Sequence, residues 1–174
     1  VSFSTEKLKK CIIIPVPHTS WHDFYIGILL RSVCSVNTSF LAKKELFFFP
    51  LSIILKWLNF TPVDRFKKGN KVDEIVSIYD KHSEFRIGLA PEGTRAKVDK
   101  LRTGFYHIAK KANIPIIMVT LDYKNKINTI SEPFYPSNDI TNDFKFIESF
   151  FKGIEGKDKD RSFCLLYTSD AADE

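Results

Sequence analysis

The sequence predicts an α/β protein, a single domain with a largely parallel central sheet covered by helices on both faces. Two observations support this fold class. Apolar segments without polar alternation, typical of strands buried on both faces, recur along the chain and are separated by helix-like segments. The 174 residues are 44% hydrophobic and 27% charged, a composition that suits one globular domain with its own core and excludes a disordered chain.

The first half of the chain begins with a strand and a helix. Residues 11–16 are a continuous apolar run, typical of a buried strand, and residues 22–34 follow a polar turn with the composition of a helix. Residues 39–43 form a second apolar segment and predict a strand. The aromatic segment 45–60 comes next, and a short strand or turn is expected at 61–65.

The second half repeats the alternation. Residues 71–82 carry apolar side chains at helical spacing, and residues 85–90 form an apolar strand that ends at a proline. A helix is expected over 103–112, with Asn113 as a left-handed residue at its C-terminal end. Residues 114–123 give the most continuous strand signal of the chain. The alternation of these segments indicates a parallel sheet.

The C-terminal region contains a closing helix that starts near Asp139 and an atypical tail. Residues 164–174, CLLYTSDAADE, resemble a translated sequencing adapter, so we expect the folded domain to span residues 1–163 and a non-native tail to follow it. The chain starts at a valine, so its natural N-terminus can lie further upstream. Without the three acidic residues of the tail, the net charge rises from +5 to +8 (26 basic minus 18 acidic residues). A basic domain favours an anionic partner such as nucleic acid, a membrane surface or a phosphorylated substrate.

Residues 17–24, PHTSWHDF, place two histidines and a carboxylate directly after the first predicted strand. His18 and Asp23 would point apart on a continuous helix, because five positions correspond to about 500° of rotation. They can meet if the chain is extended up to Ser20 and the helix, capped by Thr19 or Ser20, begins afterwards. The carboxylate would then hold one ring nitrogen and leave the other free to act as a base.

Two other interpretations of this cluster remain open at the level of sequence. Ser20 and Asp23 have the spacing of a capping box, in which both residues serve only to start the helix. His18 and His22 have the spacing of two metal ligands on one helix, but no third ligand is close in the sequence.

A second cluster, APEGTR at residues 90–95, follows the predicted strand 85–90. Loops at the C-terminal ends of parallel strands are where ligands bind in open α/β sheets. Gly93 would let backbone amides approach an anion, and Arg95 offers a planar fork for phosphate, with Glu92 placed to orient it. The alternative is a surface turn with a weak ion pair.

A third cluster, VDRFKKGN at residues 63–70, combines Arg65 with two lysines and a glycine. It is compatible with a phosphate-binding loop or with a solvated charged turn.

Taken in chain order, these clusters resemble the motif blocks of the glycerolipid acyltransferases, and in particular a short bacterial 1-acylglycerol-3-phosphate (lysophosphatidic acid) acyltransferase. The resemblance spans about residues 11–153 and rests on PHTSWHDF, FLAKKELFFFP, TPVDR, APEGTR, TGFYHIA and IPIIMV. Two details depart from the family pattern: Trp21-His22 stands where Asn-Trp is expected, and the TPVDR block lacks a preceding glycine.

The resemblance implies a fold and a reaction. The enzyme would move a fatty acyl group from acyl-CoA or acyl carrier protein to the free hydroxyl of lysophosphatidic acid, giving phosphatidic acid for phospholipid biosynthesis. It would need no cofactor and no metal. The same fold can instead act on another lysolipid or an amine, or serve as a non-catalytic lipid-binding relative.

The resemblance also implies roles for individual residues. His18 would be the general base and Asp23 its orienting partner, while Pro115 would belong to a block that lines the site. The glycerol-phosphate end of the acceptor would be bound by Arg65, Glu92, Gly93, Thr94 and Arg95.

An amphiphilic acceptor implies contact with a membrane surface, so we expect a peripheral protein on the cytoplasmic face of the membrane. Residues 43–60 combine phenylalanines, isoleucines and Trp57 with three lysines, a composition that suits the membrane interface and equally suits a helix packed on the sheet. No uncharged stretch reaches the roughly 18 residues of a membrane-spanning helix. A nucleic-acid partner is not expected, because the aromatic residues cluster with aliphatic rather than with basic ones.

Overall fold

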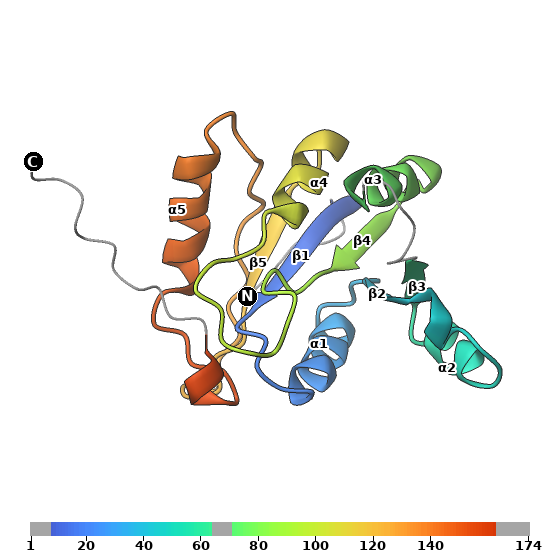
Figure 1. Ribbon diagram of the computed structural model, residues 1–174, viewed down its shortest axis with the longest axis horizontal. Helices are drawn as coiled ribbons and strands as arrows, with labels where there is room; N and C mark the ends of the chain where they lie inside the picture. The colour runs from blue at the N-terminus through green and yellow to red at the C-terminus, as the bar shows by residue number, and fades with distance from the viewer. Residues whose placement is uncertain (1–7, 64–70, 163–174) are drawn as a thin grey trace, which may run out of the picture.

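A computed structural model describes residues 8–63 and 71–162 of the chain and shows a five-stranded, all-parallel sheet (Figure 1). The strand order is β3-β2-β4-β1-β5. The strands are β1 (Lys10–Val16), β2 (Ser39–Lys43), β3 (Phe60–Val63), β4 (Phe85–Gly88) and β5 (Ile116–Thr120). The predicted fold class is therefore confirmed.

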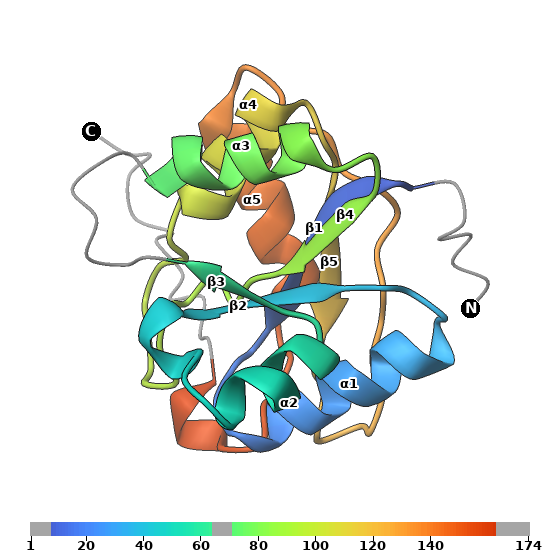
Figure 2. The same ribbon diagram turned by 90° about the vertical axis from the view of Figure 1, so that its right-hand side faces the viewer.

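Helices cover both faces of this sheet (Figures 1 and 2). One face carries α1 (His22–Val33) and α2 (Leu51–Trp57). The opposite face carries α3 (Lys71–Lys81), α4 (Gly104–Ala112) and α5 (Ile140–Phe151). Two short 3₁₀ helices, η2 (Lys44–Leu46) and η3 (Lys159–Arg161), complete the elements of the described residues.

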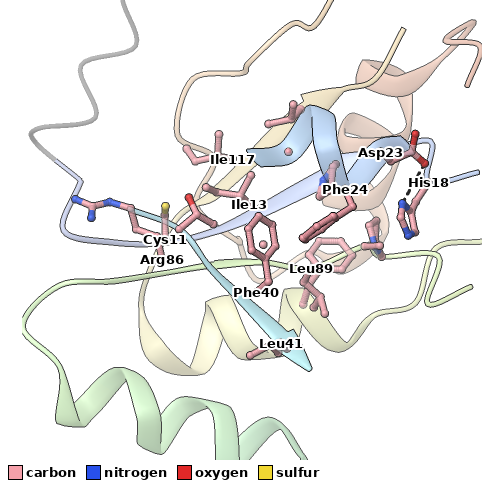
Figure 3. Close-up of a pocket in the computed structure, with 18 of the residues that line it drawn as sticks. Cys11, Ile13, His18, Asp23, Phe24, Phe40, Leu41, Arg86, Leu89 and Ile117 are labelled. Atoms are coloured by element: carbon pink, nitrogen blue, oxygen red, sulfur yellow. Dashed lines mark ion pairs between the residues drawn. The ribbon is translucent and has the colours of Figure 1, made fainter. Parts of the chain in front are cut away.

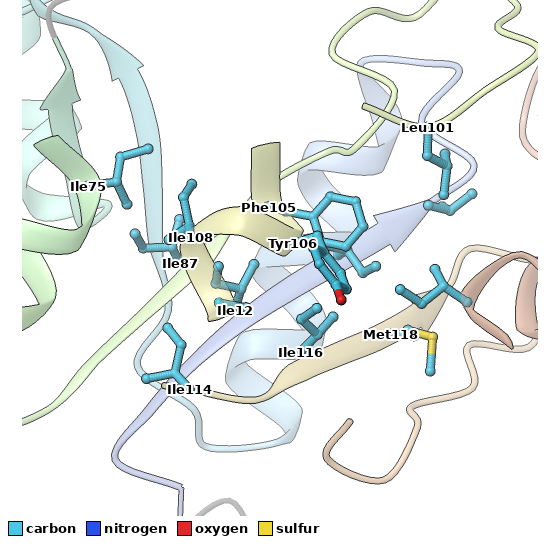
Figure 4. Close-up of a cluster of buried hydrophobic side chains, with 14 of the residues drawn as sticks. Ile12, Ile75, Ile87, Leu101, Phe105, Tyr106, Ile108, Ile114, Ile116 and Met118 are labelled. Carbon is cyan, nitrogen blue, oxygen red and sulfur yellow. The ribbon is translucent and has the colours of Figure 1, made fainter. Parts of the chain in front are cut away.

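The central strand β1 shows why the strands lack polar alternation. Ile12, Ile14 and Val16 belong to the large core beneath α3, α4 and α5, part of which is shown in Figure 4. Cys11 and Ile13 point to the other face and pack with residues of α1. Successive side chains of a strand alternate between faces, so a strand covered on both sides is apolar at every position.

Most predicted elements lie within a few residues of the observed ones, which is the usual uncertainty of element ends. The strand expected over 85–90 is shorter, and the strand expected over 114–123 is limited to β5. Asn113 adopts the predicted left-handed conformation, with φ of 52°. Asp139 caps α5, since its side chain accepts a hydrogen bond from the Asn142 amide at 3.0 Å. The predicted tail and the domain boundary at residue 163 concern residues beyond the described part, so both stay predictions.

The strand order determines where the loops meet. β1 pairs in parallel with β4 on one side and with β5 on the other. The C-terminal ends of these three strands therefore lie at one edge of the sheet, and the segments that follow them are neighbours in space. The two clusters at residues 17–24 and 90–95 are among these segments.

Candidate active site

His18 and Asp23 face each other at this edge of the sheet (Figure 3). The chain leaves β1 at Val16, and α1 begins only at His22, so the intervening residues form the predicted non-helical turn. His18 Nδ1 lies 3.2 Å from Asp23 Oδ2. The Asp23 side chain is buried, whereas the His18 side chain keeps 23% of its surface exposed. A ring held at Nδ1 in this way presents Nε2 for proton transfer.

The same carboxylate also organises the turn. Asp23 Oδ2 accepts hydrogen bonds from the backbone amides of Thr19 and Ser20, each at 2.8 Å. Asp23 thus performs one half of the predicted capping box, through the Ser20 amide, while it also holds the His18 ring. Trp21 occupies the N-cap position and makes no side-chain cap, but the Ser20 hydroxyl accepts from the amide of His22, the first residue of α1, at 3.4 Å, as expected of Ser20. The Ser20 hydroxyl also lies 2.9 Å from His22 Nδ1.

Tyr123, which follows β5, supplies a further donor to the pair. Its hydroxyl donates to Asp23 Oδ1 at 2.7 Å, across 100 positions of sequence. Burial alone would raise the pKa of Asp23, but the hydrogen bonds from His18, the Ser20 amide and Tyr123 outweigh it and lower the pKa of the carboxyl. Burial, together with the bond to Asp23, raises the pKa of the Tyr123 hydroxyl. Asp23 is therefore held as a carboxylate and Tyr123 as a neutral donor.

Sequence reasoning did not identify Tyr123. The available signal was its position, because it lies three residues after the end of β5, where the C-terminal ends of the parallel strands meet and ligands bind.

Glu92 lies beneath the turn and not in the open part of the loop. Its side chain is buried, with 3% exposure, and its two oxygens accept from the His18 backbone amide at 2.9 and 3.0 Å. Burial raises the pKa of Glu92 to about 7, although the hydrogen bond from the His18 amide lowers this pKa in part. Both residues are described, and no ion pair joins Glu92 to Arg95, so the expectation that Glu92 orients Arg95 is wrong. Glu92 instead connects the loop after β4 to the turn after β1.

The second half of this loop, Gly93 to Arg95, is exposed and carries the positive charge of Arg95. Gly93 has φ of 67°, and a Cβ there would lie 2.6 Å from Arg102 Nε, so the absence of a side chain lets this guanidinium lie against the loop. Thr94 Oγ1 accepts from the Ala96 amide at 3.2 Å. Arg95 and Arg102 both line the cleft that contains His18. Arg102 was not predicted, although it is a basic residue just before the predicted helix 103–112.

Two further residues, Arg65 and Pro115, were also predicted to belong to the site. Arg65 falls outside the described residues, so its part in the site stays a prediction. Pro115 lies just before β5, with its carbonyl accepting from the Ile12 amide at 3.0 Å. Pro115 itself is not among the residues that line the cleft, but Ile117 and Val119 of the same block are, so the expectation that this block lines the site is confirmed.

An apolar cleft of about 960 Å³ contains the His18–Asp23 pair (Figure 3) and is lined from both faces of the sheet, by Leu30 of α1 on one face and by Ile75 of α3 and Ile108 of α4 on the other. A cleft of this size can hold a large part of a lipid-sized molecule. Its apolar lining near the pair includes Ile13, Phe24, Phe40 and Leu89.

The site offers little for a metal. Within residues 8–63 and 71–162, no group of three or more His, Cys, Asp or Glu side chains is arranged to hold a metal ion. His22, the second histidine of the cluster, stacks on Trp21 with 4.1 Å between the ring centroids.

Comparison with known families agrees with this geometry. A family model described as Acyltransferase matches residues 3–122, more than half of the chain. The chain belongs to the acyltransferase family. The matched range contains the His18–Asp23 pair and the Gly93–Arg102 loop, which confirms the resemblance at the level of the glycerolipid acyltransferase family and identifies the protein as an acyltransferase. Tyr123 lies one residue beyond the match. No curated protein and no solved structure matches the chain.

The helices of this acyltransferase are short. Among the described residues, none is both long and apolar enough to cross a membrane.

Proposed function

We propose that this acyltransferase moves a fatty acyl group from acyl-CoA or acyl carrier protein to the free hydroxyl of lysophosphatidic acid, giving phosphatidic acid. The observation that supports this most directly is the position of the His18–Asp23 pair between an apolar cleft and two arginines. An acyl chain fits the cleft, and the arginines suit a phosphate.

In the proposed reaction, His18 Nε2 takes the proton from the acceptor hydroxyl while Nδ1–H stays on Asp23. The oxygen attacks the thioester carbonyl carbon, a C–O bond forms and the C–S bond breaks. The thiolate leaves and takes the proton from the imidazolium, so that a free thiol and neutral His18 result. A positioned base of this kind contributes about 10²- to 10⁴-fold to the rate.

The carboxylate of Asp23 has two tasks in this scheme. It keeps the tautomer that leaves Nε2 unprotonated, and it stabilises the transient imidazolium by charge. Its lowered pKa keeps it ionised for both tasks. No residue needs to carry the acyl group covalently, because holding donor and acceptor together beside a base is sufficient.

Arg95 and Arg102 support a phosphorylated acceptor. Guanidinium groups form paired hydrogen bonds with phosphate oxygens, and both side chains lie on the cleft wall that follows Gly93. We assign the same function to Arg65 on the basis of the family resemblance. Because both donors are cytoplasmic thioesters, we place the reaction on the cytoplasmic side of the membrane.

The experiment that tests this function is an acceptor panel. Purified protein is given radiolabelled acyl-CoA or acyl carrier protein thioester with lysophosphatidic acid, lysophosphatidylcholine, monoacylglycerol or a long-chain amine. We expect transfer to lysophosphatidic acid above all others and its loss in His18→Ala, with the variant's circular dichroism unchanged. Faster transfer to a neutral or amine acceptor would show that this acceptor, and not lysophosphatidic acid, is the preferred substrate. Undiminished transfer by His18→Ala would refute the mechanism.

A further inference from the structure

α1 exposes a row of large apolar side chains to solvent. Trp21, Tyr25, Leu29 and Val33 follow one another at intervals of four residues, so they lie on one side of the helix. All four are exposed, with 53% exposure for Trp21 and 81% for Val33. The opposite side of α1 is the packed one, since Phe24 contacts the rings of Phe40 and Phe60.

A second row continues this surface on the neighbouring helix. Ile53 and Trp57 are one turn apart on α2, and Phe49 lies just before the helix; Ile53 is 60% exposed, and both Phe49 and Trp57 are 81% exposed. The two helices lie on the same face of the sheet (Figure 2). Arg31 of α1 joins them by donating to the Leu58 carbonyl after α2 at 3.0 Å.

We propose that these two rows together form a docking surface for an anionic lipid bilayer, with α1 as well as α2 lying in the membrane interface. This proposal rests on the proposed function, since it names the partner from which that site takes its lipid. It extends the segment expected to meet the membrane to the helix that carries Asp23 itself.

Charge distinguishes a bilayer from other partners of an apolar surface. From residue 24 to residue 60 the chain has four basic residues and one acidic residue, a net charge of +3 (4 minus 1). Lys44 and Lys56 are exposed beside the second row. A basic rim around an apolar surface suits phospholipid headgroups that carry negative charge.

The tryptophans give a second argument. The chain contains two tryptophans, and both lie on this surface, at the ends of the two helices. Tryptophan favours the membrane interface because its ring is apolar and its indole N–H remains hydrated.

The cleft gives a third argument. Its lining includes Leu30 from α1, Leu46 from η2 and Leu55 from α2, so the elements that carry the two rows also form part of the wall of the cavity that contains His18. A lipid acceptor lying in the bilayer beneath this surface would reach His18 without crossing water.

The two tryptophans also make the proposal measurable. Vesicles of phosphatidylcholine alone, or mixed with phosphatidylglycerol, are added to the full chain in the absence of donor and acceptor. We expect a blue shift of emission with the mixed vesicles, and quenching by brominated lipid in Trp21→Phe and in Trp57→Phe alike. Quenching of Trp57 without Trp21 would overturn the participation of α1. A lack of binding to both vesicle types would overturn the surface as a whole.

Matched variants test the apolar and the electrostatic contributions to vesicle binding separately. Leu29→Asp combined with Val33→Asp should weaken binding at least about tenfold by removing two apolar anchors. Ile127→Asp is the control, because Ile127 is 57% exposed, close to the 59% of Leu29, but lies after β5. Lys44→Gln and Lys56→Gln should each weaken binding to anionic vesicles about fivefold, with Lys145→Gln on α5 as control. Equal effects of test and control variants would overturn the proposal.

Two measurements distinguish membrane docking from dimerisation through the same surface, and distinguish a failure of docking from a failure of the proposed acyl-transfer reaction. A dimer in light scattering that the Leu29→Asp, Val33→Asp variant turns into a monomer would assign the surface to a second copy of the chain. Transfer to a short-chain, water-soluble acceptor should be unchanged in that variant, because neither residue lines the cleft. Loss of vesicle binding with this transfer retained supports docking, whereas retained transfer by His18→Ala refutes only the reaction mechanism.

Discussion

The turn at residues 17–23 and the loop at residues 91–103 form two halves of one site and are built in opposite ways. The turn is tied from three sides: to its own amides through Asp23, to Tyr123 after β5 and to Glu92 after β4. The loop leaves its cations, Arg95 and Arg102, exposed. The turn that carries the proposed base is thus held by several hydrogen bonds, while the side chains proposed to bind the acceptor stay exposed.

The difference follows from what each half has to do. A base must keep its position and tautomer throughout proton transfer, and small displacements are costly in rate. A guanidinium that waits for a phosphate gains by remaining in water, because burying an unpaired charge is expensive. The four predictions below test this difference between the hydrogen-bonded turn at residues 17–23 and the exposed loop at residues 91–103.

Asp23→Asn should have the largest effect on the rate. It removes the charge that stabilises the imidazolium and places an amide donor among groups that are themselves donors. We expect a fall of about 10²- to 10⁴-fold in kcat, measured by steady-state transfer with saturating lysophosphatidic acid. A loss confined to KM would show that the pair binds substrate and does no proton transfer.

Arg95→Ala and Arg102→Ala should act on binding of the acceptor. We expect KM for lysophosphatidic acid to rise about tenfold or more in each variant, since a charged hydrogen bond contributes about 1.5–3 kcal/mol. The KM for monoacylglycerol should change little, and Lys145→Ala serves as the exposed basic control. If KM rises equally for the neutral acceptor, the loop does not recognise phosphate.

Tyr123→Phe should have a smaller effect that depends on pH. The hydroxyl helps to lower the pKa of Asp23, so its removal raises this pKa and moves the acid-side fall of kcat/KM to higher pH. We expect about a tenfold lower rate near neutrality, since one of several hydrogen bonds to the carboxylate is lost. A pH–rate profile of the variant, compared with the wild type, measures this shift. A uniformly lower rate with an unmoved profile would assign Tyr123 a structural role only.

Glu92→Gln should change stability more than rate. The pKa of Glu92 is raised from 4.5 to about 7, so the stability that its neutral form contributes is complete below pH 4.5 and is lost as pH rises through about 7. The wild type should lose about 3 kcal/mol relative to the glutamine variant over this range. Urea unfolding of both proteins at several pH values between 4.5 and 8 measures the difference. Parallel curves would show that Glu92 stays ionised in the folded protein.

The fold was predictable from the sequence to a large extent. Continuous apolar runs such as 11–16 occur only where both faces of a strand are covered, and they alternate with helical segments, so the layer architecture follows from local pattern. The end of α4 was also predictable from a local signal, because Asn113 tolerates the left-handed conformation that ends a helix. The segment 45–60 was not divided correctly into η2, α2 and the start of β3, since aromatic residues suit a helix, a strand and an interface alike.

The contact between His18 and Asp23 was predictable because the two residues are close in the sequence. His18 and Asp23 are five residues apart, and a turn followed by a helix is sufficient to bring them together. The spacing of the motifs, together with the family resemblance, also placed Gly93 and Arg95 at the cleft. Sequence by itself therefore determined the fold class, the pair and the presence of a cationic loop.

The supporting contacts were decided by the tertiary structure alone. Whether Glu92 faces Arg95 or the His18 amide depends on β4 lying next to β1, and the bond from Tyr123 to Asp23 depends on β5 lying on the other side. Strand order is a property of the whole packed sheet, because each pairing depends on which faces the helices cover. No local pattern in the sequence contains that information, so the groups that hold the base in place emerge only when the chain is folded.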